Sequence, residues 1–124
     1  MQDSPDPDAV AAAAALRYIA NQTFGIVCTL AHGGAVGRAE NRALVRYLDL
    51  NLRPLAELGV EKFDLVAVVD TQPATGNNSL PDGTQVDIVF DHHPIRQASR
   101  AARFTDVRRD YGATSTILFE YLQA

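Results

Sequence analysis

The spacing of apolar positions along the chain predicts three helices. Apolar residues recur with the period of a helix in the segments Asp8–Asn21, Glu40–Leu50 and Thr114–Leu122. The first of these segments is rich in alanine. We expect Asp8 to cap its N-terminus, with Pro7 just outside the helix.

Shorter runs that are almost entirely apolar predict strands, because a strand buried on both faces shows no alternation with polar residues. The clearest runs are Phe63–Val69 and Val86–Phe90, both rich in β-branched residues. The run Phe24–Leu30 predicts a third buried strand, and Arg103–Val107 predicts a short edge strand. Turn-forming residues between positions 73 and 83 separate the two clearest strands.

Apolar strands separated by helices predict an α/β fold with three layers, α/β/α, around a mainly parallel sheet. The 124 residues are enough for one domain. Ligands of such sheets bind beyond the carboxyl ends of the strands. The two clearest strands deliver Asp70 and Asp91 to that edge, although an aspartate after a strand is also a common turn former.

The composition is that of a soluble globular protein, with 47% hydrophobic and 21% charged residues. The longest apolar run, Ala9–Leu16, is too short to span a membrane, and no basic segment precedes it, so we expect neither a membrane partner nor a secretory signal. The single cysteine, Cys28, excludes a disulfide framework and fits a cytoplasmic location. We expect Cys28 to be inert packing within its strand.

The formal net charge of −4 argues against a duplex-DNA binder. Arginine nevertheless gathers in one stretch near the C-terminus. The planar guanidinium suits phosphate oxygens, so this stretch is either an anion-binding segment or an ordinary solvated surface. Its five arginines are Arg96, Arg100, Arg103, Arg108 and Arg109.

Carboxylates and histidines recur at three points of the chain. They are Pro5-Asp6-Pro7-Asp8, Asp70-Thr71 and Asp91-His92-His93. Carboxylates that crowd together repel one another unless a cation lies between them. Oxygen ligands with one or more imidazoles suit Mn²⁺ or a similar ion, so these segments predict a bound metal pair. Taken singly, each aspartate could also have a purely structural role as a helix cap or a turn former.

The two adjacent histidines predict two different roles. Neighbouring side chains on an extended segment diverge, so His92 and His93 do not both face the same metal. One imidazole would bind the metal, and the other would face the substrate as a general acid or electrostatic stabiliser.

These motifs resemble the N-terminal part of the DHH-family phosphoesterases, which are named for their Asp-His-His sequence. The resemblance covers the chain from about Asp3 to Leu122 and rests on the motifs Pro5–Val10, Val68–Thr71 and Val89–Pro94. Ala35–Leu44 and Tyr111–Leu122 are similar to weaker signatures of the family. The family includes oligoribonuclease and pAp phosphatase enzymes, cyclic-dinucleotide phosphodiesterases, single-strand DNA exonucleases, manganese pyrophosphatases and exopolyphosphatases.

The resemblance implies a role for each site residue. Asp6 and Asp70 would bind one metal, and Asp8, Asp70 and His92 the second, both Mn²⁺. His93 would face the phosphate as a catalytic group, and Asp91 would orient the motif. A hydroxide between the two metals would attack phosphorus. Arg96 follows the motif closely enough to reach a phosphate of the substrate.

The chain also departs from the family pattern. Gln2 stands where the family has a histidine, and a neutral glutamine oxygen is a weak ligand for the first metal. A strand before Gln2, a further aspartate beyond the last helix and a C-terminal substrate domain all fall outside residues 1–124. We therefore expect these residues to be a single DHH-type domain cut from a longer protein. On its own this piece would bind metal weakly and hydrolyse little.

The resulting hypothesis is a metal-dependent phosphoesterase that hydrolyses short RNA or small nucleotides. The segments Gly37–Arg42 and Asp70–Pro73 look more like the oligoribonuclease branch of the family than the pyrophosphatases. The alternatives are a single-strand nuclease, a cyclic-dinucleotide phosphodiesterase, or a catalytically silent nucleotide-binding or regulatory module. We interpret His32 as a surface histidine and Gly76–Asn78 as a turn. The oligomeric state stays open.

Overall fold

The computed structural model describes all residues from 1 to 124. Three α-helices and five short strands make up the regular structure, together with three single-turn 3-10 helices. The helices are α1 (Pro7–Phe24), α2 (Ala39–Tyr47) and α3 (Thr114–Gln123). The strands are β1 (Ala31–His32), β2 (Arg53–Pro54), β3 (Ala67–Val69), β4 (Ile88–Asp91) and β5 (Phe104–Val107). The 3-10 helices are η1 (Leu55–Glu57), η2 (Val60–Lys62) and η3 (Gln97–Ala101).

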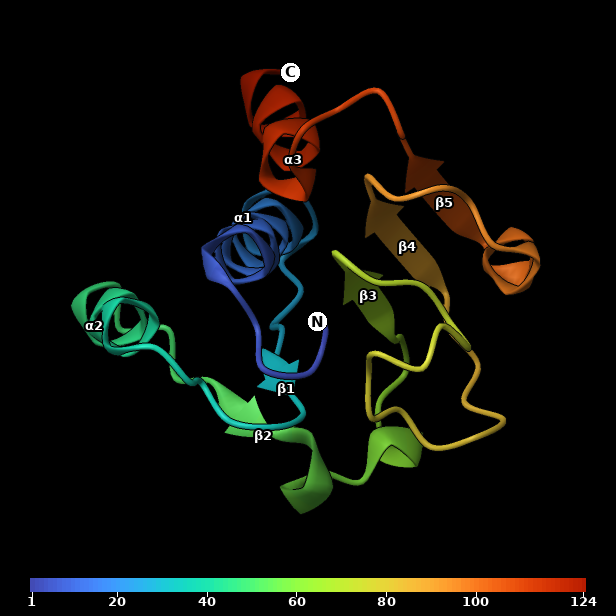
Figure 1. The fold of residues 1–124 in the computed structure, drawn as a ribbon. Coiled ribbons are helices and arrows are strands. Elements are labelled where there is room, and N and C mark those ends of the chain that lie inside the picture. Colours follow the sequence, from blue (N-terminus) through green and yellow to red (C-terminus); the bar gives the residue numbers. More distant parts are fainter.

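The two clearest strands of the sequence are neighbours in a parallel sheet of order β3-β4-β5, with β4 at its centre and β3 at one edge. Val68 pairs with Val89 and Val69 with Phe90, which sets the carboxyl ends of β3 and β4 side by side. Helices α1 and α3 lie together on one face of this sheet, and α2 lies beyond α1 (Figure 1). Strands β1 and β2 form a second, two-stranded parallel sheet. The predicted α/β fold with a parallel sheet is confirmed.

The hydrophobic core lies between helix α1, helix α3 and the sheet. Small residues of α1 allow α3 to approach closely, since Ala12 and Ala13 are buried between the two helices and the strands. The core cluster is Val10, Ala12, Ala13, Leu30, Leu50, Val69, Phe90, Ile117 and Leu118. None of the helices is long and apolar enough to cross a membrane.

The predicted strand Phe24–Leu30 is wrong. Helix α1 continues to Phe24 and ends at Gly25, whose φ of 66° requires the left-handed conformation that glycine adopts freely. The residues that follow have no neighbouring strand to pair with, and Val27 is 88% exposed. Pairing begins only where the carbonyl of Leu30 accepts a hydrogen bond from Arg53 N, at 2.9 Å.

Other predicted elements keep their type but change their ends. The second helix stops at Tyr47 rather than Leu50, because Asp49 has a positive φ that no helix contains. The run Phe63–Val69 follows η2 directly and forms a strand only over its last three residues, which pair with β4. His32 is buried rather than on the surface, and its Nδ1 lies 3.1 Å from the carbonyl oxygen of Gly33.

We predict that Leu118→Ala destabilises the fold by about 2–5 kcal/mol, because it opens a cavity in the packed core. Leu122→Ala on the same helix should cost far less, since Leu122 is 42% exposed whereas Leu118 is fully buried. Urea denaturation of both variants measures the difference. Equal losses would show that α3 does not pack against α1 and the sheet as described.

Candidate active site

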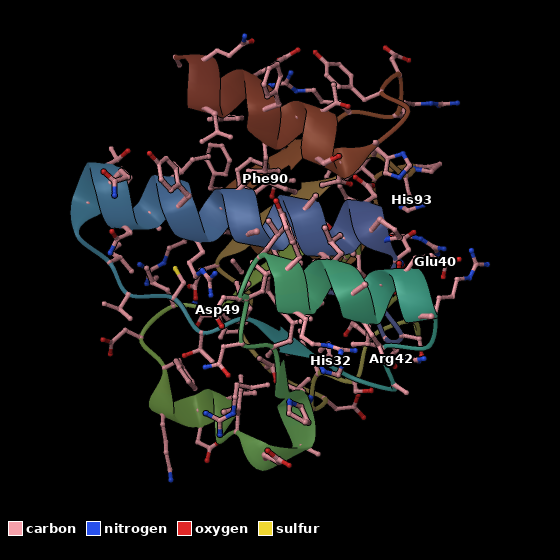
Figure 2. All side chains as sticks on the ribbon, turned by 90° about the vertical axis from the view of Figure 1, so that its left-hand side faces the viewer. His32, Glu40, Arg42, Asp49, Phe90 and His93 are labelled. Carbon is pink, nitrogen blue, oxygen red and sulfur yellow. The ribbon has the colours of Figure 1, made fainter.

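The carboxyl ends of β3 and β4 bring the predicted site residues together. Asp70 directly follows β3, and Asp91 is the last residue of β4. Asp70, Asp91, His92 and His93 each place one potential ligand atom within 4.8 Å of the others. His93 lies at the end of the molecule where α2 begins, as Figure 2 shows.

The N-terminal segment that carries Asp6 and Asp8 is docked beside this edge by its backbone. Asp3 N donates to the carbonyl of Asn77 at 2.8 Å, and Ser4 N donates to that of Gly33 at 3.0 Å. A Cβ at Gly33 would lie only 1.9 Å from Asp3 Oδ1, so any larger residue there would displace the Asp3 side chain. The glycines after His32 therefore allow the N-terminal segment that carries Asp6 and Asp8 to lie against this loop.

The residue that caps α1 is Asp6 and not Asp8. Asp6 caps its own helix, accepting from Ala9 N at 2.9 Å, so the prediction that Asp8 caps α1 is wrong. Asp8 instead caps α3, accepting from Thr114 N at 2.9 Å and Ser115 N at 2.8 Å. Burial opposes ionisation of Asp8, but its hydrogen bonds with Ser115 and Thr114 outweigh burial and lower its pKa.

His92 presents one open nitrogen to the acidic residues. Its Nδ1 lies 3.2 Å from the carbonyl oxygen of Tyr111, which can only accept, so Nδ1 carries the proton of this bond. Its Nε2 lies 3.3 Å from Asp70 Oδ1 and 3.9 Å from Asp8 Oδ2. A neutral imidazole in this tautomer directs a lone pair at two carboxylates, which is the arrangement of a metal ligand set.

Asp70 is the most constrained of the acidic residues. It is buried, its φ is 60°, and its Oδ1 accepts from Thr114 Oγ1 at 2.9 Å. Burial, followed by repulsion from Asp8 and Asp6, raises the pKa of Asp70 to about 6. A divalent cation beside it would offset both effects, and carboxylate oxygens with an imidazole nitrogen fit Mn²⁺ and similar ions.

His93 hydrogen-bonds to Asp91 rather than to Asp70 or Asp8. Its Nδ1 lies 2.8 Å from Asp91 Oδ1, while its side chain is 51% exposed. The two imidazole rings are close, with centroids 4.3 Å apart, but they hydrogen-bond to different partners. Asp91 is buried and also accepts from Gln72 Nε2 at 2.8 Å. This geometry leaves Nε2 of the half-exposed His93 ring without a hydrogen-bond partner in the protein.

The remaining candidates lie at the margin of the site. Asp6 is near enough to contribute to the raised pKa of Asp70, but one of its oxygens is occupied by the α1 cap. Arg96 has an exposed side chain, and its backbone N donates to Gln72 Oε1 at 2.7 Å. The turn at Gly76–Asn78 is present, and Asn78 Nδ2 donates to the carbonyl of Gln72 at 3.0 Å.

Three residues that hold the site were not singled out from the sequence: Gln72, Tyr111 and Thr114. Tyr111 acts through its backbone carbonyl, which any residue possesses, so its identity carries no signal. Thr114 stands at the start of a predicted helix, where threonine is ordinary. Gln72 lies in a turn-rich loop, and nothing in its neighbours indicates that its amide is buried.

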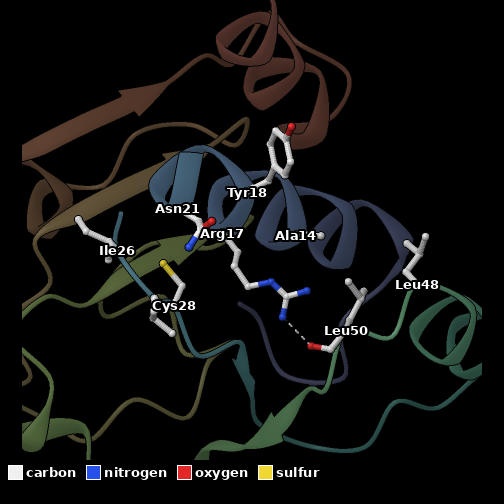
Figure 3. Close-up of a pocket in the computed structure, with 9 residues that line it drawn as sticks. Ala14, Arg17, Tyr18, Asn21, Ile26, Cys28, Leu48 and Leu50 are labelled. Carbon is white, nitrogen blue, oxygen red and sulfur yellow. Dashed lines mark hydrogen bonds between the residues drawn. The ribbon is translucent and has the colours of Figure 1, made fainter. Parts of the chain in front are cut away.

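A separate cavity of about 450 Å³ lies between α1, residues 26–28 and the end of α2 (Figure 3). Arg17 Nη1 crosses it to donate to the carbonyl of Leu50 at 2.8 Å. Cys28 lies in its wall, half-buried, and burial raises the pKa of the Cys28 thiol, which makes it a weak nucleophile. None of the predicted site residues lines this cavity.

We predict that Asp70→Asn stabilises the metal-free protein by about 1–3 kcal/mol near neutral pH, because it removes a buried charge. Asparagine also tolerates the positive φ of this position. With a folded-state pKa of about 6, above its ordinary value, Asp70 retains a proton that the unfolded chain releases. Its contribution to stability therefore falls as pH rises from about 4 to about 6.

Urea denaturation in EDTA at about pH 5 and about pH 7 measures this effect as the difference between wild type and variant. Asp82→Asn, at an exposed position, is the matched control. A stability difference between wild type and Asp70→Asn that does not change with pH would contradict the prediction.

Comparison with known proteins agrees with this geometry. The model of the "DHH family, N-terminal domain" matches residues 1–124. The chain is also 35% identical over 120 residues to the "Uncharacterized protein MJ1633" of Methanocaldococcus jannaschii. The aligned segment makes up 96% of this chain and 24% of that relative. The chain thus spans about a quarter of that relative's length. The DHH family is in general one of metal-dependent phosphoesterases. With its whole length matched and its Asp-His-His motif at the edge of a parallel sheet, the chain belongs to the DHH family.

Proposed function

We propose that this domain forms the metal-binding and catalytic part of a phosphoesterase that hydrolyses short RNA or small nucleotides. The observation that carries the proposal is the meeting of Asp8, Asp70 and His92, with the open Nε2 of His92 directed at both carboxylates. A structural ion pair would explain one such contact. It does not explain why the buried Asp70 lies beside the half-buried Asp8, a group of like charge, at the edge of the sheet that binds ligands.

The proposed ligands follow from the donor set. Asp8, Asp70 and His92 hold one Mn²⁺, while Asp6 and Asp70 hold the second, with Asp70 shared. A shared position is supported by the charges of both Asp8 and Asp6, which add to burial in raising the pKa of Asp70. When bound, the ions supply Lewis-acid chemistry, which lowers the pKa of water and neutralises charge on the phosphate.

The other residues act on the substrate. The half-exposed His93 faces the phosphate through Nε2 as a general acid or electrostatic stabiliser, while the buried Asp91 holds its Nδ1. Arg96 offers an exposed guanidinium to phosphate oxygens on the same side. A cytoplasmic location accords with the single free Cys28.

We predict that substitution of the two histidines separates metal binding from turnover. His92→Ala removes a ligand and lowers the manganese content, because its Nε2 faces Asp70 and Asp8. His93→Ala keeps the manganese and lowers turnover by about 10²–10⁴. Asp70→Ala is the most severe variant, since a shared carboxylate serves both ions. Mass spectrometry of bound metal, beside turnover of pAp and a short RNA, measures all three in the full-length protein.

The histidines serve as controls for each other, since they are adjacent and receive the same substitution. If His93→Ala loses the manganese while His92→Ala retains it, the two roles are reversed. If Asp70→Ala stays active, the two-metal proposal fails.

We predict two manganese sites by calorimetry on the full-length protein, even with Gln2 at the position where the family has histidine. Loss of both sites in Asp70→Ala would show that both depend on the shared Asp70 carboxylate. The complete absence of manganese binding by the wild type would instead favour a catalytically silent nucleotide-binding module. Hydrolysis of a cyclic dinucleotide or single-stranded DNA in preference to pAp and short RNA would correct the substrate class alone.

A further inference from the structure

Gln72 lies two residues after Asp70, is 1% exposed, and makes four hydrogen bonds through its side-chain amide. Its Nε2 donates to Asp91 Oδ2 at 2.8 Å and to the carbonyl of Pro94 at 3.0 Å. Its Oε1 accepts from Arg96 N and from Ser99 Oγ, both at 2.7 Å. A primary amide has two donors and two acceptor lone pairs, so this group is fully used.

The orientation of this amide is fixed by partners that have only one possible role. A backbone N–H can only donate, so the atom facing Arg96 N is the oxygen. The carbonyl of Pro94 can only accept, so the atom facing it is the nitrogen. The amide therefore always presents an N–H to Asp91, whatever the state of the metal site.

This fixed donor acts on His93 through Asp91. One oxygen of the Asp91 carboxylate accepts from Gln72, and the other lies 2.8 Å from His93 Nδ1. An ionised carboxylate has no proton to donate, and the Gln72 N–H favours this form and holds its Oδ2, so the imidazole donates from Nδ1 to Oδ1. In the neutral ring Nε2 is then free of hydrogen, on a side chain that is 51% exposed.

We propose that Gln72 is a positioning residue that selects the Nδ1–H tautomer of His93 and anchors the Arg96 backbone beside it. The chain of hydrogen bonds runs from Arg96 N–H through the Gln72 amide and the Asp91 carboxylate to the His93 ring. This chain links His93 and Arg96, two groups assigned to the substrate phosphate. The effect on the substrate rests on the proposed function. The tautomer itself depends only on the hydrogen bonds.

No other residue type meets the same demands at this position. Glutamate would place an oxygen against the Asp91 carboxylate and the Pro94 carbonyl, two groups that accept. An apolar side chain would leave Arg96 N–H and the fully buried Ser99 without an acceptor. The variants Gln72→Glu and Gln72→Met test these two failures separately, and Gln97→Glu at an exposed position of η3 is the matched control.

Nitrogen-15 NMR of the histidine rings tests the tautomer without any assay of activity. At about pH 8.5, where imidazoles are neutral, we expect His93 of the metal-free wild type to show Nδ1–H and a free Nε2. We expect Gln72→Glu and Gln72→Met to lose this preference, with faster amide hydrogen exchange at Arg96, and Gln97→Glu to keep it. An Nε2–H tautomer in the wild type overturns the proposal even if neither variant folds, as does the wild-type tautomer in both folded variants.

The catalytic consequence has its own readout in the full-length protein. We expect Gln72→Glu to lower kcat by about 10- to 100-fold while the manganese content stays that of wild type, because the Gln72 side chain hydrogen-bonds to none of the four proposed ligands, Asp6, Asp8, Asp70 and His92. A lost tautomer preference with unchanged kcat would refute the catalytic consequence and leave the structural one. If the wild type hydrolyses no phosphoester, the proposed function fails, and the NMR result still decides the tautomer.

Discussion

The rest of the site depends on the hydrogen bonds between the Asp8 carboxylate and helix α3. Asp8 belongs to the first turn of α1 yet accepts from the first two backbone N–H groups of α3, 106 residues further along the chain. Helix N-termini have unpaired N–H groups and a positive dipole end, so an ionised aspartate is a strong partner there. This contact joins the two helices that cover the sheet. It also sets Thr114 where its hydroxyl reaches Asp70.

The same arrangement has an electrostatic cost. Burial, with added repulsion from Asp8 and Asp6, raises the pKa of Asp70 and so disfavours its charged form. The fold nevertheless buries Asp70 directly after β3 and faces it with the open nitrogen of His92. Sites of this kind are less stable than they would be with neutral residues, and a bound cation offsets the penalty. Metal affinity and the stability of the metal-free fold are therefore expected to oppose each other.

The two histidines show how neighbouring residues of one type acquire different chemistry. Each has its Nδ1 bound within the protein, His92 to the carbonyl of Tyr111 and His93 to the carboxylate of Asp91. Both rings thus present Nε2, but that of His92 faces carboxylates, whereas the His93 side chain is half-exposed. The difference comes from the partners of Nδ1, and for His93 these lead back to the buried amide of Gln72.

The sequence by itself determined the α/β class, the two neighbouring strands that deliver Asp70 and Asp91, and the grouping of the acidic motifs with His92 and His93. These follow from local patterns, because apolar runs and chain order dictate which ends of parallel strands meet. Only the tertiary structure decided that residues 26–30 stay outside a sheet, since a strand needs a partner that no local pattern supplies. It also moved the helix cap of Asp8 from α1 to α3, because a carboxylate binds whichever unpaired N–H groups packing brings within reach, and sequence distance does not enter.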